Sequence, residues 1–306
     1  MLKLREKLFH GGKGKKRFGA TQNKATLFII IMILPALYGI FRYLYVNINS
    51  ILIAFSDSVT GNFTLRYFSD LFDEMGRADS TIFKALLNTF KFFGVAILKL
   101  FISYIVAYFL YKKIWLTKAF RFIYFLPSLI APVVNVTIYI CIIGINGVLH
   151  ELSGFSESFP ALLSDPDSII LMILLYDFLF SGLGTNFLIL LGAMNRVPVE
   201  LLESGKIDGC TAWREFWQIV TPLVWDSFST LLVLNFTKIF ISSGPILYFT
   251  GGRGEPYTLS FWIYDQVRDS TYNYPAAVGL FFTLIGIPIV FGVRKLAKII
   301  SPEVSF

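Results

Sequence analysis

The stretch "VPVELLESGKIDGCTAWREFWQIVTPLVWD", from Val197 to Asp226, decides how the rest of this chain is interpreted. It lies between two apolar segments and carries charged residues, two prolines and two glycines. A polar stretch of this length between apolar segments predicts a folded element on the surface of a membrane, where a partner protein could bind it.

The order of residues in this stretch predicts two helices joined at a glycine. Pro198 suits the first turn of a helix, and Glu200 and Glu203 near that start favour the helix dipole. Gly209 then breaks the helix. Beyond it, apolar residues recur at the spacing of one helix face until Pro222 ends the second helix: Trp213, Phe216, Trp217 and Val220. The residues alone leave two interpretations open, an elbow that a partner binds or an interfacial helix among lipid headgroups.

The composition excludes a water-soluble globular protein. Of the 306 residues, 55% are hydrophobic and 15% are charged, whereas soluble domains carry about 25% charged residues. The net charge of +7 comes from short basic clusters between apolar segments, which indicates membrane topology and not a nucleic-acid-binding face. The two cysteines and two histidines have no metal-ligand spacing, so we expect no metal site, no catalytic set and no enzymatic activity.

Six segments are long and apolar enough to cross a bilayer, because a spanning helix needs about 20 mostly apolar residues. They are residues 25–46, 86–111, 120–146, 168–192, 224–247 and 275–297. The predicted fold is an all-α membrane protein with six transmembrane helices in residues 25–299, preceded by a basic tail of residues 1–24. The first segment is interpreted as an uncleaved anchor, because it is too long for a signal peptide. A coupling loop, residues 197–222, joins the fourth and fifth spans.

The distribution of Lys and Arg predicts the orientation, because basic loops stay on the cytoplasmic side. Basic residues dominate three regions: eight lie between Lys3 and Lys24, four are Lys112, Lys113, Lys118 and Arg121, and three are Arg294, Lys295 and Lys298. The opposite loops are acidic, with Asp57, Asp70, Asp73, Glu74 and Asp79, then Glu151, Glu157, Asp165 and Asp167. Both termini and the 197–222 loop are therefore predicted to be cytoplasmic, and the tail is expected to attract membrane lipid.

The segment "ELLESGKIDGCTAWREFWQIVTPL" resembles the cytoplasmic "EAA" loop of binding-protein-dependent ABC importer permeases. That pattern is roughly E-A-A-x-x-D-G-A, about nine variable residues, and then I-x-L-P. Glu203, Asp208 and Gly209 stand at the Glu and Asp-Gly positions, and Ile219 and Pro222 at its end. The departures from the pattern are Ser204, Gly205, Cys210 and Thr221.

Other segments extend the resemblance over about residues 80–300. Residues 121–139 and 182–203 are similar to the third and fourth spans of the carbohydrate-importing branch, and residues 247–266 resemble its Thr-Gly-Gly outer loop. The chain is thereby identified as a member of this family and resembles the maltose-type "F" subunit.

The resemblance implies a function and a set of partners. The chain would be a permease that moves a sugar or oligosaccharide across a bacterial cytoplasmic membrane by alternating access. It would pair with a second homologous permease, two cytosolic ATPase subunits and an extracellular or periplasmic solute-binding protein. ATP and Mg²⁺ would be used by the ATPases, and this chain would bind no cofactor. The residues expected to couple it to an ATPase are Glu200, Glu203, Gly205, Asp208, Gly209, Trp213 and Phe216.

Polar residues inside the spans are candidates for the substrate path, because such groups are costly in a membrane. They are Asn135, Asp177, Asn186, Asn235, Lys238 and Ser242. Lys238 is expected halfway along the fifth span, either in the path or paired with Asp177. Lys91 and Lys99 in the second span could instead reach the membrane surface.

Two alternative functions stay open. The first is import of an anionic small solute, such as a glycerol phosphate or a uronate. The second is an ion-coupled secondary transporter, which would use polar spans but would not need the 197–222 loop, and which usually shows internal repeats that this sequence lacks.

Overall fold

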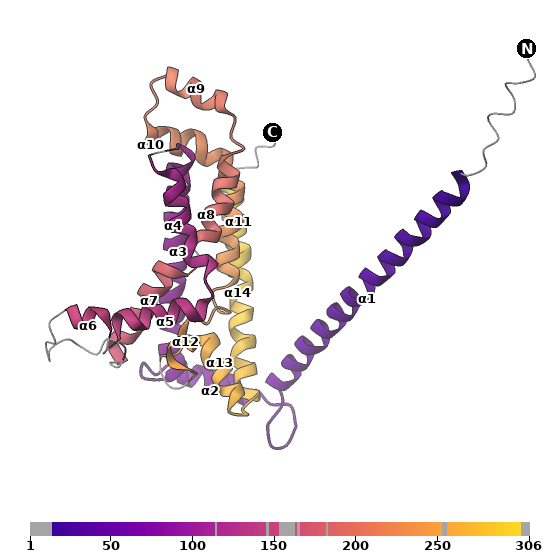
Figure 1. The fold of residues 1–306 in the computed structure, drawn as a ribbon. Coiled ribbons are helices and arrows are strands. Elements are labelled where there is room, and N and C mark those ends of the chain that lie inside the picture. Colours follow the sequence, from indigo (N-terminus) through magenta and orange to yellow (C-terminus); the bar gives the residue numbers. More distant parts are fainter. Residues whose placement is uncertain are drawn as a thin grey trace, which may run out of the picture.

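The computed structural model describes residues 14–113, 115–144, 147–152, 163, 166–181, 183–252 and 256–300. The chain forms the following elements in order (Figure 1): α1 (Gly14–Ala54), α2 (Arg66–Met75), α3 (Thr81–Tyr111), α4 (Thr117–Leu129), α5 (Pro132–Ile143), α6 (Val148–Leu152), α7 (Pro166–Phe180), α8 (Leu183–Met194), α9 (Val199–Ile207), α10 (Ala212–Glu215), the π-helical turn η2 (Phe216–Val220), α11 (Thr221–Thr237), α12 (Ile246–Thr250), α13 (Leu259–Arg268) and α14 (Asn273–Ile300). Over the described residues the fold is helical, with one isolated β-bridge between Ser56 and Phe63.

The long apolar helices agree with the predicted class of a multi-span membrane protein. Within the described residues, five helical segments are long and apolar enough to span a bilayer, and a sixth is obtained if a bent pair of helices counts as one span. The five are 31–54, 81–111, 168–194, 212–237 and 273–300. Figure 1 shows α3, α8, α11 and α14 standing side by side, with α9 and α10 at one end and α2 and α13 at the other.

The predicted span 120–146 is not one straight helix. It consists of α4 and α5, whose axes are bent by 103° at a break of two residues. Ile130 and Ala131 leave the helical conformation there, and Pro132 occupies the first turn of α5. A proline disfavours the helical conformation of the residue before it and has no N–H to continue the helix, which explains the break.

The fifth span begins and ends earlier than the predicted 224–247. Pro222 does not end a helix, because α10, η2 and α11 form one continuous helical segment from Ala212 to Thr237. The wide turn η2 precedes this proline, and the N–H of Thr221 donates to the carbonyl of Phe216 five residues back. The segment ends at Lys238, before a Ser-Ser-Gly-Pro sequence in which Gly244 has a φ of +61°.

The main core lies where α3, α8 and α11 meet. Its buried side chains include Tyr104 and Tyr108 of α3, Phe187 of α8, and Phe216 and Phe228 along the η2–α11 segment. Leu202 of α9 also belongs to this cluster, so the polar loop between α8 and α10 is anchored on the bundle.

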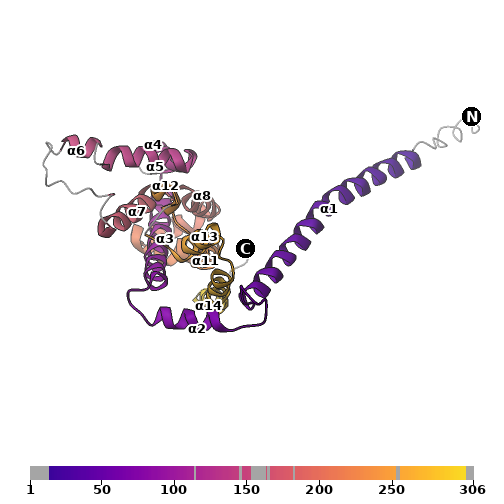
Figure 2. The same cartoon turned by 90° about the horizontal axis from the view of Figure 1, so that it is seen from below.

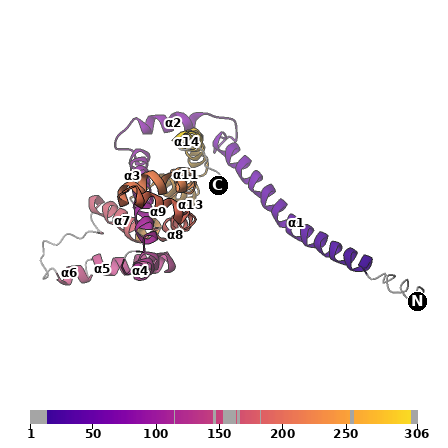
Figure 3. The ribbon, with the colours of Figure 1, turned by 90° about the horizontal axis from the view of Figure 1, so that it is seen from above.

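α1 stands apart from this bundle. Figures 1, 2 and 3 all show it leaning away from the other helices, and only its last turns come near α2 and α14. Asn273 at the start of α14 ties this junction by donating to the carbonyls of Ile53 and Ser56, at 3.2 and 2.6 Å. The apolar side chains of α1 from Ile31 to Ile53 are exposed in the single chain, so lipid or another subunit must cover them.

Part of the predicted basic tail, residues 1–24, is helical. Residues 14–24 already belong to α1, which continues without interruption through the predicted first span, 25–46, to Ala54. The remainder of the predicted basic tail, residues 1–13, lies outside the described residues.

Candidate functional site

The polar loop forms an elbow of two helices at one end of the bundle (Figure 1). α9 follows Pro198, and its last turn closes with the N–H of Cys210 donating to the carbonyl of Gly205, at 2.9 Å. Gly209 then takes a φ of +74°, a conformation that side chains with a Cβ disfavour. Thr211 caps α10 by accepting a hydrogen bond from the N–H of Arg214. The elbow, residues 199–220, is therefore a turn with defined hydrogen bonds at each end.

α9 approaches the η2 turn closely at Gly205. A Cβ at this position would lie 2.6 Å from the δ-methyl group of Ile219, so only a glycine fits without a shift of that side chain. Gly205 is buried, together with Leu202. These two residues fix α9 against the start of the fifth span.

The remaining face of α9 is uncovered. Glu200, Glu203 and Asp208 are exposed, and so are the apolar side chains of Val199 and Ile207, the latter to 87%. Within the described part of the chain, this face of α9 makes no contact with the bundle that would keep a partner from reaching it.

The seven residues predicted to contact an ATPase do not share one environment. Five of them are exposed on the elbow: Glu200, Glu203, Asp208, Gly209 and Trp213. Gly205 and Phe216 are buried, and Phe216 is only 1% exposed. The predicted aromatic ridge is therefore divided: Phe216 and Val220 pack into the core, whereas Trp213 and Trp217 are exposed. Phe216 supports the elbow from inside.

The elbow also contains a buried carboxylate that was not among the predicted site residues. Glu215 is 2% exposed, and both its oxygens accept from the ammonium group of Lys112, at 2.6 and 2.8 Å. Tyr108 lies beside the pair and donates to the carbonyl of Ala212, at 2.8 Å. The position of Glu215 between Arg214 and the apolar residues that follow is the sequence signal that could have identified it.

Two of the six substrate-path candidates are engaged in local structure. Asn135 is buried and donates to the carbonyls of Pro127 and Ile130, so it secures the break between α4 and α5. Asn235 donates to the carbonyl of Leu231 within its own helix. Asn186 on α8 is half-buried.

Asp177 pairs with Lys99 and not with Lys238. The ammonium group of Lys99 lies 2.6 Å from Oδ2 of Asp177, and it also donates to the carbonyls of Asp177 and Ser181, at 3.1 and 3.0 Å. Both side chains are buried. The proposed alternative pair of Lys238 with Asp177 is therefore wrong, because α3 and not α11 lies against the end of α7.

Lys238 lies at the end of a span and not at its middle. It follows the last residue of α11, and its side chain is exposed in the single chain. Among the described residues it has no ion-pair partner. Ser242, four residues later, is also exposed and lies in the turn before α12, where it accepts from the N–H of Gly244.

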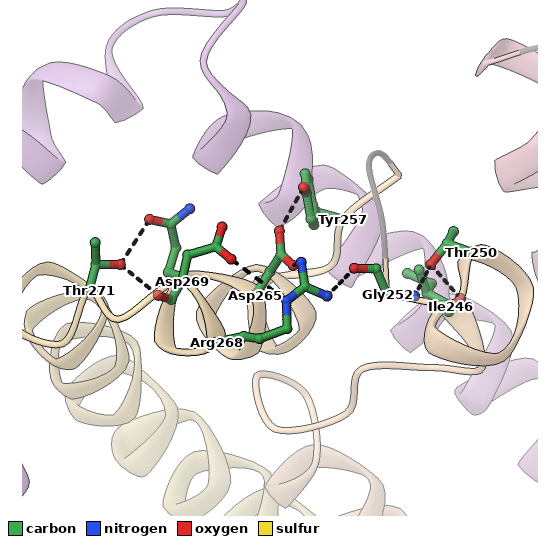
Figure 4. A network of polar contacts seen from close by, with 9 residues as sticks. Ile246, Thr250, Gly252, Tyr257, Asp265, Arg268, Asp269 and Thr271 are labelled. Carbon is green, nitrogen blue, oxygen red and sulfur yellow. Dashed lines mark hydrogen bonds and ion pairs between the residues drawn. The ribbon is translucent and has the colours of Figure 1, made fainter.

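A second polar network lies at the opposite end of the bundle, where α12 and α13 connect the fifth and sixth spans (Figure 4). Arg268 of α13 donates to the carbonyl of Gly252 and forms ion pairs with Asp265, at 2.5 Å, and Asp269, at 3.7 Å. Tyr257 donates to the other oxygen of Asp265, at 2.9 Å. This network, the Arg268 network, ties the Thr-Gly-Gly turn to α13.

The described part of the chain offers no group of three or more His, Cys, Asp or Glu side chains that could hold a metal ion.

Comparison with known proteins identifies the family. Residues 99–306 match the family described as "Binding-protein-dependent transport system inner membrane component". Protein LplB of Bacillus subtilis (strain 168) is 24% identical over 96% of this chain and 95% of its own. The polygalacturonan/rhamnogalacturonan transport system permease protein YteP of the same strain is 24% identical over 90% of this chain and 89% of its own. The sn-glycerol-3-phosphate transport system permease protein UgpA of Yersinia pseudotuberculosis is 25% identical, but over 50% and 52% of the two chains.

Two solved structures share the fold. A bacterial ABC transporter involved in the import of the acidic polysaccharide alginate matches with a TM-score of 0.70 and 19% identity, over 91% of this chain and 97% of the matched chain. The bacterial alginate ABC transporter in complex with an alginate pentasaccharide-bound periplasmic protein matches with a TM-score of 0.74 and 19% identity, over 93% and 99%. The resemblance seen in the elbow sequence is thus confirmed over more than half of the chain, and this multi-pass membrane protein belongs to the family of binding-protein-dependent transport system inner membrane components.

Proposed function

We propose that the chain is one of two homologous permease subunits of an ATP-driven importer that moves a sugar or oligosaccharide into the cytoplasm by alternating access. The exposed surface of α9 carries this proposal, because it presents carboxylates and apolar side chains on a helix anchored to the bundle by Leu202 and Gly205. An anchored helix transmits a displacement, whereas a flexible loop would absorb it.

Two cytosolic ATPase subunits supply the energy in this proposal, and ATP and Mg²⁺ bind to them. One of them contacts this chain through the exposed residues of the elbow, Glu200, Glu203, Asp208, Gly209 and Trp213. A solute-binding protein delivers the substrate from the other side of the membrane, which the complex of the alginate transporter with its periplasmic protein supports. Lipid and the second permease cover the exposed apolar surface of α1.

The charge distribution supports an orientation with the elbow and both termini in the cytoplasm of a bacterial plasma membrane. Lys112 and Lys113 end α3 next to the elbow, while the acidic α2 region lies at the other end of the bundle. In a cysteine-free background, Ile207→Cys should react with a membrane-impermeant maleimide only in inverted vesicles, and Val59→Cys, which is 90% exposed in the outer loop, only in right-side-out cells. The opposite labelling pattern would refute this orientation.

The relatives support a saccharide as the substrate. Their names include a polygalacturonan/rhamnogalacturonan permease and an importer of alginate. We place the substrate path along the third to fifth spans, with Asn186, Lys238 and Ser242 as the candidates whose side chains are accessible or half-buried.

An acidic saccharide or another anionic solute is the second candidate. Lys238 favours it, because its ammonium group is exposed at the end of α11 and has no anionic partner among the described residues. A Lys238→Met variant should assemble normally and lose more uptake of an acidic oligosaccharide than of a neutral one. Equal uptake of both would favour a neutral sugar.

Copurification followed by reconstitution tests the main proposal. The chain should copurify with an ATPase and a second permease, and liposomes should take up the solute only when ATP and the binding protein are both present. Glu203→Lys and Gly209→Pro should abolish uptake and weaken ATPase binding while the spans stay inserted. Uptake by this chain alone, driven by an ion gradient, would instead establish a secondary transporter.

A further inference from the structure

One face of α3 holds the elbow through three side chains. Tyr104, Tyr108 and Lys112 are spaced four residues apart, which places them above one another on a helix. Tyr104 donates to the hydroxyl of Thr221 at 2.9 Å, Tyr108 donates to the carbonyl of Ala212, and Lys112 pairs with Glu215. We call these three residues together with Glu215 the α3–elbow joint.

Glu215 is the charged centre of this joint. A carboxylate that is almost fully buried must be paired or hydrogen-bonded, because the loss of hydration is otherwise uncompensated. Glu215 obtains this compensation from Lys112, and the hydroxyl of Tyr108 adds a longer contact at 3.3 Å. Among the described residues, the polar partners of this carboxylate all come from the end of α3. A shift of the elbow away from α3 would therefore leave the carboxylate without these partners.

The same face of α3 also contacts the π-helical turn η2. The ring of Phe216 packs between the rings of Tyr104 and Tyr108, with centroid distances of 5.0 and 4.8 Å. The hydroxyl of Thr221 donates to the carbonyl of Phe216, at 2.8 Å, and accepts from Tyr104. A π turn inside an α-helix often marks a functional position. Here Phe216 at the start of the turn packs against α3, and Thr221 directly after the turn is hydrogen-bonded to α3.

α3 also contacts the span of residues 168–194 near its middle. Lys99 lies 13 residues before Lys112, which corresponds to roughly 20 Å along a helix. It binds the carbonyls of Asp177 and Ser181, where α7 gives way to α8. The single helix α3 therefore contacts the elbow at its C-terminal end and the α7–α8 junction farther into the bundle.

We propose that Lys112 and Glu215 are positioning residues for energy coupling: they deliver a displacement of the elbow to α3, and through α3 to the α7–α8 junction, rather than to α11 alone. This inference rests on the proposed function, because it requires an ATPase that moves the elbow. Coupling between distant sites passes through packed and hydrogen-bonded contacts, and this joint is such a contact between two helices.

The test uses the complete importer in liposomes and measures solute uptake per ATP hydrolysed in assembled complexes. Lys112→Met and Glu215→Gln should lower this ratio about tenfold, the size of a typical coupling between sites, and ATP hydrolysis should lose its dependence on the loaded binding protein. Lys112→Arg keeps the cation and should retain the ratio. The reversed pair, Lys112→Glu with Glu215→Lys, should restore part of it.

A milder variant and a control separate coupling from folding. Tyr108→Phe removes one hydroxyl and leaves the ring packing, so it should assemble normally and still lower the ratio. Asp70→Asn breaks the exposed pair with Arg66, at 3.6 Å on α2, and should leave the ratio unchanged. A merely structural role would reduce the amount of assembled complex in the Lys112 and Glu215 variants while uptake per ATP stayed at the wild-type value, and this result would overturn the inference.

The wild-type complex distinguishes the two proposals. If it couples uptake to ATP hydrolysis and Lys112→Met, Glu215→Gln and Tyr108→Phe all match it, only the α3–elbow joint is refuted. If the wild-type complex hydrolyses no ATP or imports no solute, the proposed function fails and this inference falls with it.

Discussion

The pair of Lys99 with Asp177 and the pair of Lys112 with Glu215 are both attached to α3, but their surroundings differ. Lys99 and Asp177 are equally enclosed, with side chains 9% and 10% exposed, and three acceptors surround the ammonium group. In the other pair Glu215 is enclosed while Lys112 keeps an open side, with side chains 3% and 24% exposed. Both members of the first pair are thus shielded from water, and we call it the closed pair. In the second, the half-open pair, the ammonium group of Lys112 can also be hydrated, as a joint that moves between states requires.

The largest expected effect comes from breaking the closed pair. Lys99→Met leaves the carboxylate of Asp177 buried without a cation, which costs about 3–5 kcal/mol in comparable buried pairs. We expect the variant to lose most of its folded, monodisperse material in detergent, measured by size exclusion and thermal unfolding. Asp177→Leu in the same chain should recover much of the loss. Lys91→Met is the matched control, since Lys91 lies exposed on the same helix; equal stability of both single variants would contradict the role of the closed pair.

Breaking the half-open pair, Lys112 with Glu215, should cost less stability. Glu215→Gln keeps the shape of the side chain and lets Lys112 turn to water, so the cost is that of a buried hydrogen bond to a charge, about 1–3 kcal/mol. The shift of the unfolding midpoint should be clearly smaller than for Lys99→Met. Asp226→Asn, at an exposed position of α11, should cause no shift. A larger loss for Glu215→Gln than for Lys99→Met would reverse the comparison.

A still smaller effect is expected at the turn of the elbow. Gly209→Ala forces a Cβ into a left-handed conformation, which costs about 1–2 kcal/mol for residues other than glycine. Nothing lies near that Cβ, so the cost should be backbone strain alone. Gly192→Ala on α8, which also has open space and a helical conformation, should be neutral or slightly stabilising. Thermal unfolding that gave the same midpoint for both variants would show that the strain is relieved elsewhere.

The smallest effect on stability should come from Lys238. As an exposed lysine without an ion-pair partner among the described residues, it can be changed to Met within about 0.5 kcal/mol. Unfolding and copurification of Lys238→Met should match the wild type. A strong loss of assembly would show that the side chain meets a partner subunit.

The two pairs also mark how far the sequence could predict the structure. Apolar length and helical period predicted five of the spanning helices and the glycine at the elbow, because these are local properties of the chain. The partner of Asp177 could not be predicted from period or charge, because Lys99 lies 78 residues away and Lys238 was an equally reasonable cation. Only the packing of α3 against α7 decides between them.

The same limit applies to the elbow. An apolar stripe at helical spacing is identical whether it faces a partner or its own bundle. Phe216 and Val220 were therefore predicted on one ridge with Trp213 and Trp217, although they lie in the core. Pro222 predicted a helix end by its chemistry, but the wide turn before it accommodates a residue without an N–H. The burial of Phe216 and Val220 depends on α3, which the local sequence of the loop does not contain.

Lys99 and Asp177 lie far apart in the sequence, and this has a consequence during synthesis. At about 5–20 residues per second, a ribosome needs roughly 4–16 s to add the 78 residues between them. During that interval α3 already carries its lysine, but the acceptors on α7 do not yet exist. The nascent helix must therefore stay beside the insertion machinery, or keep its lysine hydrated, until α7 emerges. The order in which the chain leaves the ribosome thus makes α3 dependent on a helix made much later.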